Sequence, residues 1–116
     1  MRHRNKTVTL DRKKAPREAL LRNLAESVIL YEKVQTTDAK AKAVRGLVER
    51  MITKSKANTL HARREISKVL YTKNAVAKCL EVLGPRYGAQ KGGYTRTVKI
   101  GPRKGDGAEI VQIELV

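Results

Sequence analysis

The chain has 116 residues, of which 26 are Lys or Arg and 11 are Asp or Glu, so its formal net charge is +15. Hydrophobic residues make up 41% of the chain, which suits one core and is too much for a disordered basic tail. The single cysteine excludes a disulfide framework and cysteine-rich zinc modules, and no apolar run approaches the roughly 20 residues that span a bilayer. Such a strong positive charge favours a polyanionic partner.

The charge is concentrated in two short segments. Residues 1–17 carry seven basic groups and one acidic group, and residues 86–105 carry six basic groups and no acid. Residues 1–15 contain too few large aliphatic side chains to bury themselves, so we predict a basic extension there and a single domain over 16–116. The extension is either an arm that orders against phosphates, which we expect, or a solvated tail without a partner.

The first half of the chain predicts a helix, a short strand and a second helix. Pro16 suits the first turn of a helix over 16–31, whose apolar side chains recur every three or four residues. The β-branched run 33–37 predicts a strand, and Thr37 or Asp38 is expected to cap a helix over 38–56. Gly46 within that helix permits a close approach, either by another helix, which we expect, or by RNA.

The second half predicts two more helices and two strands. Asn58 or Thr59 starts a helix to about residue 70, and Asn74 is expected to cap another that stops at Gly84–Pro85. Cys79 lies on the apolar face of the latter helix and is expected in the core. Alternating residues over 94–100 and 109–116 predict two antiparallel strands joined by a glycine-rich turn, and strand 33–37 completes the sheet. The order is α-β-α-α-α-β-β, an α+β domain with a small mixed or antiparallel sheet packed on helices.

No arrangement of side chains predicts catalysis. Carboxylates are few and dispersed, the two histidines lie far apart, and neither a nucleophile elbow nor a glycine-rich phosphate loop of Walker or Rossmann spacing occurs. We therefore expect no enzyme activity, no metal, no cofactor and no small-molecule substrate. A free nucleoid- or RNA-binding protein of histone-like type, and a basic protein for acidic partners or anionic membranes, both fit the composition. The lack of a basic amphipathic helix with bulky aromatic residues argues against a membrane partner.

Two short stretches are candidate phosphate sites. In the stretch 86–96, Gly92 and Gly93 allow the backbone to approach a phosphate between Lys91 and Arg96. The neighbouring Tyr94 either stacks on a base or belongs to the core, and the pattern does not separate these alternatives. The hydroxyls of the Thr36–Thr37 pair precede a helix N-terminus and either bind an anion or, as we expect, cap the helix.

Several motifs resemble the bacterial large-subunit ribosomal protein L17 family, collinearly from residue 1 to residue 116. They are the opening MRHR, VQTTDAKAKAVR at 34–45, HARR at 61–64, LGPRY at 83–87, GGYTR at 92–96, RKGDGA at 103–108 and the terminal IELV. The chain departs from the family at Thr7 and Val8, where a glycine and a basic residue are usual. It departs again at 14–16, where Ser-Ser-His is usual and Pro16 replaces a serine cap.

The resemblance implies a structural constituent of the large ribosomal subunit in the bacterial cytoplasm. Such a protein binds large-subunit rRNA through phosphate neutralisation and shape, near the peptide exit side, beside neighbouring large-subunit proteins and away from any membrane. At the matching positions it implies RNA contact by Arg2, His3, Arg4, Arg12, Arg17, Arg22, Asn23, Thr36, Thr37, Lys40, Lys42, Arg45, Arg63, Arg64, Arg86, Gly92, Gly93, Tyr94, Thr95 and Arg96. The charge pattern adds Lys6, Lys13, Lys14 and Lys91.

Overall fold

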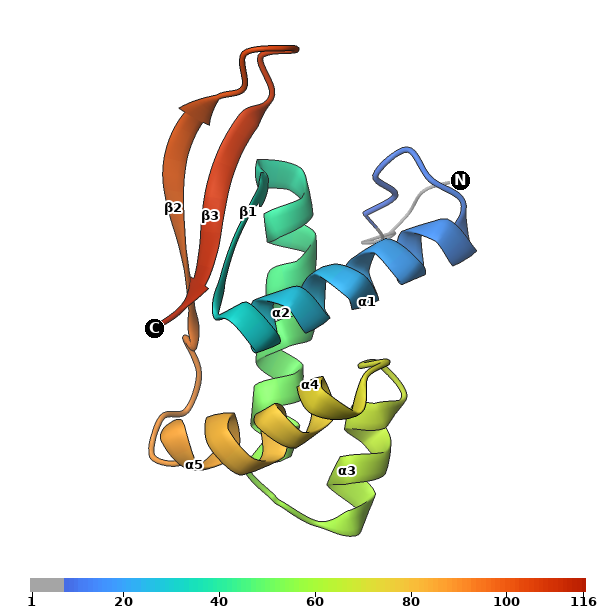
Figure 1. Ribbon diagram of the computed structural model, residues 1–116, viewed down its shortest axis with the longest axis vertical. Helices are drawn as coiled ribbons and strands as arrows, with labels where there is room; N and C mark the ends of the chain where they lie inside the picture. Colours follow the sequence, from blue (N-terminus) through green and yellow to red (C-terminus); the bar gives the residue numbers. More distant parts are fainter. Residues whose placement is uncertain (1–7) are drawn as a thin grey trace, which may run out of the picture.

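A computed structural model of the chain, which describes residues 8–116, shows a three-stranded sheet packed against helices (Figure 1). This architecture confirms the predicted α+β class. The elements are α1 (Lys14–Tyr31), β1 (Lys33–Thr37), α2 (Asp38–Ser55), α3 (Leu60–Ser67), α4 (Lys73–Lys78), a π-helical turn (Cys79–Leu83), α5 (Gly84–Arg86), β2 (Thr95–Pro102) and β3 (Glu109–Leu115).

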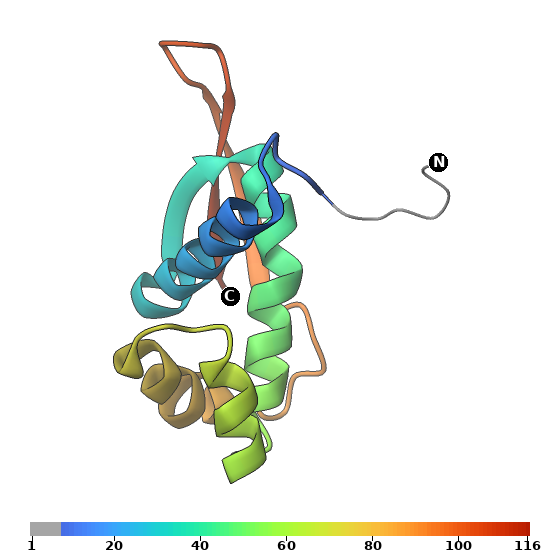
Figure 2. The same cartoon turned by 90° about the vertical axis from the view of Figure 1, so that its right-hand side faces the viewer.

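The sheet has the order β1-β3-β2, and both strand pairs are antiparallel. The register aligns Val34 of β1 and Thr97 of β2 with Ile113 of β3. Val111 and Ile113 of the central strand are fully buried, because their side chains point toward the helices. The β2–β3 hairpin continues beyond the end of the helical body, so its turn projects from the molecule (Figures 1 and 2).

The core lies between the sheet and helices α1 and α2, and it continues between α2 and the segment from α3 to the π-helical turn. Val28 and Ile29 of α1 and Val44, Val48 and Ile52 of α2 are all fully buried. These residues follow the helical spacing that the sequence shows, so the apolar stripes predicted for both helices are confirmed. Helices α3, α4 and α5 gather at the end of α2 farthest from the hairpin turn (Figure 1). No helix among residues 8–116 is long and apolar enough to cross a membrane.

Several helix boundaries differ from the predictions: α1 starts at Lys14, two residues before the predicted start, and α3 ends at Ser67, about three residues before the predicted end. Thr59 caps α3 as expected, since its Oγ1 accepts a hydrogen bond from the amide of Ala62 at 3.1 Å. However, Thr72 caps α4 in place of Asn74, through a 3.4 Å bond from the amide of Ala75 to its Oγ1. The expected stop at Gly84–Pro85 is also wrong. Gly84 has right-handed helical dihedrals (φ −54°, ψ −57°), and the proline stands in the first turn of α5, where a missing N–H leaves no hydrogen bond unmade.

The two helical glycines have opposite surroundings. A Cβ on Gly84 would lie 2.8 Å from the carbonyl oxygen of Ser55, so this glycine allows the turn before α5 to touch the end of α2. A Cβ on Gly46 would meet nothing within 4 Å, and the residue is exposed. The expectation that Gly46 serves close helix packing within the chain is therefore wrong, and close approach by RNA remains a prediction.

The core also contains the only cysteine. Cys79 is fully buried, as expected, and its thiol donates to the carbonyl oxygen of Met51 at 3.5 Å. Burial raises the pKa of this thiol to about 11, so it is a structural residue at neutral pH.

In contrast, Leu60, Val98 and Ile100 are exposed although they belong to apolar patterns, because no described element covers their side of α3 or β2.

Candidate RNA interface

The basic extension enters the described structure only at its end. Arg2, His3, Arg4 and Lys6 lie outside the described residues. Arg12, Lys13 and Lys14 are exposed where the chain enters α1, and Arg17 is half-buried one turn later. The guanidinium of Arg12 bonds the carbonyl oxygen of Leu10 at 2.9 Å, while no carboxylate of residues 8–116 pairs with any of these four groups. The start of α1 therefore presents concentrated charge that an anion could neutralise.

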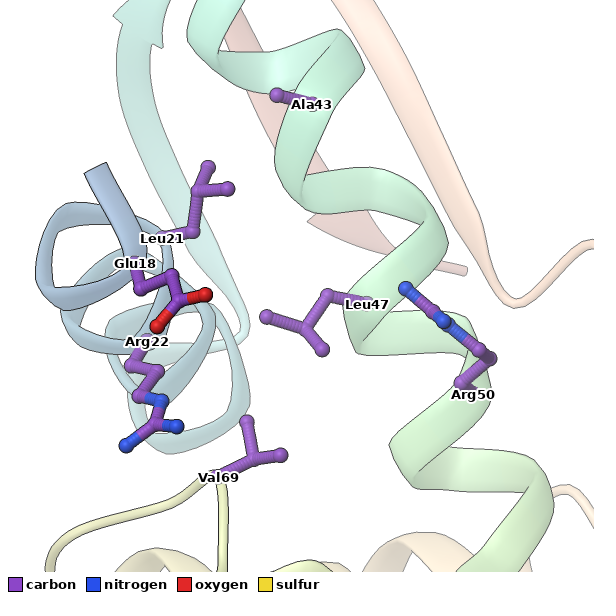
Figure 3. A pocket seen from close by; sticks show the side chains of 7 residues that line it. All are labelled: Glu18, Leu21, Arg22, Ala43, Leu47, Arg50 and Val69. Atoms are coloured by element: carbon purple, nitrogen blue, oxygen red, sulfur yellow. The ribbon is translucent and has the colours of Figure 1, made fainter. Parts of the chain in front are cut away.

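Helices α1 and α2 enclose a hollow of about 310 Å³ that carries arginines at its edge (Figure 3). Leu21, Leu47 and Val69 provide its apolar lining, Glu18 and Arg22 line it from α1, and Arg50 lines it from α2. Neither arginine forms an ion pair within the described part of the chain. Arg22 is a predicted contact. Arg50 was missed because its spacing alone did not show that it lines an open hollow; its Nε donates to the carbonyl oxygen of Gly46 at 3.3 Å.

The exposed side of α2 provides a second group of cations around Gly46. Arg45 is exposed, Lys40 is half-buried, and Lys42 is exposed although it pairs with Asp38 at 3.1 Å. An exposed i,i+4 pair of this kind contributes only about 0.3–0.5 kcal/mol, so a phosphate could compete for the ammonium. Because Gly46 has no side chain, it leaves open space beside these cations.

The threonine pair at the start of α2 does not cap the helix through a side chain. Thr36 and Thr37 are half-buried, and Thr37 occupies the N-cap position without a side-chain hydrogen bond to the helix. The capping role that we expected is therefore wrong. Asp38 instead supplies negative charge in the first turn, where it interacts favourably with the helix dipole. A phosphate here would be repelled by Asp38, so this is a weaker anion site than the sequence pattern suggested.

The segment 86–105 carries less free charge than its composition implies. Four of its six basic groups pair with carboxylates from outside the segment: Arg86 with Glu32, Arg96 with Glu114, Lys99 with Glu109 and Arg103 with Asp106. Within the described structure, only Lys91 and Lys104 of this segment form no ion pair. The local net charge is thus closer to +2 than to +6, and most of the unpaired charge lies on α1, α2 and α3.

The Arg86 pair is a structural connection between distant parts of the chain. Glu32, which ends α1 in a left-handed conformation (φ 64°), accepts hydrogen bonds from Arg86 and Lys78. Arg86 is the larger influence and Lys78 the second, and together they lower the pKa of the Glu32 carboxyl to about 2. Lys78 also donates to the carbonyl oxygen of Leu30 at 2.8 Å. Contact of Arg86 with RNA stays a prediction, and it would have to compete with this pair.

Tyr94 belongs to the core, which is one of the two alternatives that its pattern left open. Its side chain is 1% exposed, and its ring centroid lies 5.2 Å from that of Tyr87. Its hydroxyl donates to the carbonyl oxygen of Gln90 at 3.3 Å and accepts from Thr53 at 3.4 Å. The ammonium of Lys56 lies 4.7 Å from the ring centroid. The ring therefore cannot stack on a base while it occupies this position.

The glycines before Tyr94 remain accessible to an anion. Gly93 has a left-handed backbone (φ 63°), and the side-chain amide of Gln90 donates to the carbonyl oxygens of Gly92 and Gly93 at 2.7 and 2.9 Å. These bonds fix the turn and leave both glycine amides without an acceptor among residues 8–116. Lys91 is exposed beside them. Phosphate binding by this turn remains a prediction, now without Tyr94 as a stacking partner.

The remaining predicted residues lie on α1, α3 and β2. Arg63 and Arg64 are exposed on α3, away from its buried Ala62 and Ile66, as predicted, and Asn23 is exposed on α1. Thr95 is half-buried at the start of β2 and donates to Glu49 at 3.3 Å. The described residues contain no group of three or more His, Cys, Asp or Glu side chains that could hold a metal ion.

Comparison of the sequence with known protein families shows which proteins it is related to. A model of ribosomal protein L17 matches residues 20–116. The chain belongs to the ribosomal protein L17 family. It is 57% identical over 116 residues to the large ribosomal subunit protein bL17 of Solibacter usitatus, covering 100% of this chain and 77% of that protein. It is 49% identical over 116 residues to bL17 of Gemmatimonas aurantiaca, covering 100% and 98%.

Membership in this family agrees with the resemblance that the sequence motifs showed. It places the chain among structural ribosomal proteins and not among enzymes, as the lack of a catalytic pattern predicted. The family model begins at residue 20, whereas the alignments with both relatives cover this whole chain.

Proposed function

We propose that this L17-family protein is a structural constituent of the large ribosomal subunit in the bacterial cytoplasm, where it binds large-subunit rRNA near the peptide exit side, beside neighbouring large-subunit proteins. The family supports the assignment to the subunit. The observation that supports RNA binding is that the basic side chains paired with carboxylates and those without such a partner lie on different parts of the chain. Most basic groups of residues 86–105 are neutralised within the chain, whereas α1, α2 and α3 present arginines and lysines without carboxylate partners.

The proposed contacts use phosphate neutralisation and shape more than base readout. The unpaired cations lie on different elements that the packed core holds at fixed separations, so they match a folded RNA surface. Among the predicted contacts, those that form no ion pair within the described structure are Arg12, Lys13, Lys14, Arg17, Arg22, Lys40, Arg45, Arg63, Arg64 and Lys91.

The basic extension, residues 1–15, is proposed to act as an arm that becomes ordered on rRNA. Its described part, residues 8–15, is exposed except for the half-buried Leu10, so it contributes little to the core. Its charge would instead neutralise phosphates at a distance from α2 and α3. This role predicts that the arm affects assembly into the subunit more than it affects the stability of the free protein.

The salt dependence of binding to a large-subunit rRNA fragment tests the proposal. Eight neutralised phosphates would give a log–log slope of roughly −6 to −7, because each phosphate contributes about 0.7 to 0.9. Replacing Arg63 and Arg64 by Gln should make this slope shallower by roughly 1.5. A matched control replaces Lys99 and Arg103 by Gln. It removes the same charge from two groups that pair with Glu109 and Asp106 and are not among the predicted contacts, so it should change the slope little.

A slope near zero for the unaltered protein would overturn the RNA-binding proposal. Equal changes in slope for the two double variants would overturn the distinction between paired and unpaired cations. Both variants carry exposed substitutions, so their thermal unfolding should stay close to that of the unaltered protein.

A further inference from the structure

An exposed aromatic ring stands in the loop between α3 and α4. Tyr71 is 57% exposed, whereas Tyr87 and Tyr94 are buried in the core. The ring is nevertheless held in place from α1. The guanidinium carbon of Arg22 lies 5.6 Å from its centroid, and a nitrogen of that group donates to the Tyr71 hydroxyl at 3.4 Å. The amide of Thr72 donates to Glu26 at 2.8 Å, which fixes the loop itself.

This ring forms part of a second hollow, of about 270 Å³. The buried side chains of Leu70 and Val76 provide apolar lining, and the exposed Arg63 and Lys73 provide two cations. Ser67 adds a hydroxyl, and no carboxylate lines the hollow. It therefore combines an aromatic ring, an apolar surface and a positive edge, and the carboxylate of Glu26 beside it is engaged by the amide of Thr72.

We infer that this hollow binds one unpaired nucleotide of an RNA, with the base stacked on Tyr71 and the phosphate held by Arg63 and Lys73. The inference rests on the proposed RNA-binding function and adds a site at which a base is contacted. Bases stack on aromatic rings whatever their identity, since every base has a π-face. The fixed position of the ring favours this role, because little conformational freedom is lost when the base binds. An acidic protein segment would satisfy the two cations but would leave the exposed ring without a stacking partner.

Fluorescence anisotropy with a labelled single-stranded RNA octamer tests the inference on the full chain. Tyr71→Ala should weaken binding roughly 5- to 150-fold, the range of one base–aromatic stack, and Tyr71→Phe should retain most of the affinity because it keeps the ring. Tyr71→Ala should leave the salt slope unchanged, since no charge is removed, whereas Lys73→Gln should make it shallower by roughly 0.7. Tyr31→Ala is the matched control, because Tyr31 is also exposed, at 72%, and should change nothing.

A crosslinking experiment locates the base directly. Irradiation of the complex with an octamer that carries 4-thiouridine should attach RNA to the peptide that contains Tyr71. Attachment only elsewhere would overturn the inference, as would an unchanged affinity of Tyr71→Ala. Tighter binding of an acidic peptide, such as a glutamate octamer, would assign the hollow to a protein partner.

These failures are distinguishable from failure of the proposed function. In those cases, the unaltered protein would still bind the rRNA fragment with its steep salt dependence. Loss of that salt dependence in the unaltered protein would instead overturn both proposals.

Discussion

Replacing each helical glycine by alanine tests the packing of the two helices in opposite directions. Alanine is favoured over glycine in a helix by about 1 kcal/mol, so propensity alone predicts that both variants are more stable. Gly46→Ala should follow this expectation, because the new Cβ meets nothing within 4 Å. Gly84→Ala should not, because its Cβ would lie 2.8 Å from the backbone oxygen of Ser55.

The clash at Gly84 involves backbone, which a side-chain rotation cannot relieve. The same carbonyl oxygen accepts the amide of Asn58 at 3.2 Å, so a shift of Ser55 would also disturb the turn into α3. Overpacking of this kind costs about 1–3 kcal/mol. This cost is in most cases larger than the gain of about 1 kcal/mol in helix propensity. We therefore expect Gly84→Ala to be destabilised by about 1 kcal/mol and Gly46→Ala to be stabilised by about 1 kcal/mol.

Guanidinium chloride unfolding, followed by circular dichroism, measures both variants against the unaltered protein. The midpoints should move in opposite directions while the slopes stay the same, because neither substitution changes the surface exposed on unfolding. Stabilisation of Gly84→Ala as large as that of Gly46→Ala would refute the close contact between the turn before α5 and the end of α2.

Three further predictions concern the ends of α1 and the core. Glu32→Gln should lower the free energy of unfolding at pH 7 by about 1 kcal/mol. This value is small because the side chain of Glu32 is 39% exposed, so that solvent screens its ion pairs. Because the folded pKa of Glu32 is about 2 and its ordinary value is 4.5, this stabilisation is complete above 4.5 and disappears as the pH falls toward 2. A gap that persists unchanged at pH 2, measured by denaturant unfolding, would contradict this. The thiol of Cys79 should resist a disulfide reagent at pH 8 in the folded protein, and immediate stoichiometric labelling would show that it is accessible. Deletion of residues 2–13 should leave the unfolding free energy within about 1 kcal/mol but reduce incorporation into subunits, and full incorporation would refute the role of the arm.

The fold was largely predictable because it depends on local patterns. Apolar spacing located α1 and α2, and the short β-branched run located β1 to the residue. The antiparallel pairing of β2 and β3 followed from alternation and a glycine-rich turn. What local patterns could not give was the continuation of the helix through Gly84 and Pro85, because that depends on a contact with Ser55 about thirty residues earlier in the chain.

The candidate interface was less predictable, since composition counts charges but does not show their partners. Arg86 and Glu32 are 54 residues apart in sequence and meet only in the folded chain. Tyr94 and Tyr71 show that the surroundings of an aromatic side chain are equally hard to predict from the sequence. The glycine-rich motif drew attention to Tyr94, which is buried, whereas Tyr71 lies in an unremarkable loop and only the fold places it beside Arg22.

Sucrose-gradient sedimentation of a cell lysate, probed for this chain, tests the central claim most directly. The account predicts that the chain migrates with the large ribosomal subunit and stays with it at moderate salt. A chain that sediments with nucleoid DNA, with membranes, or alone at the top of the gradient would contradict the account.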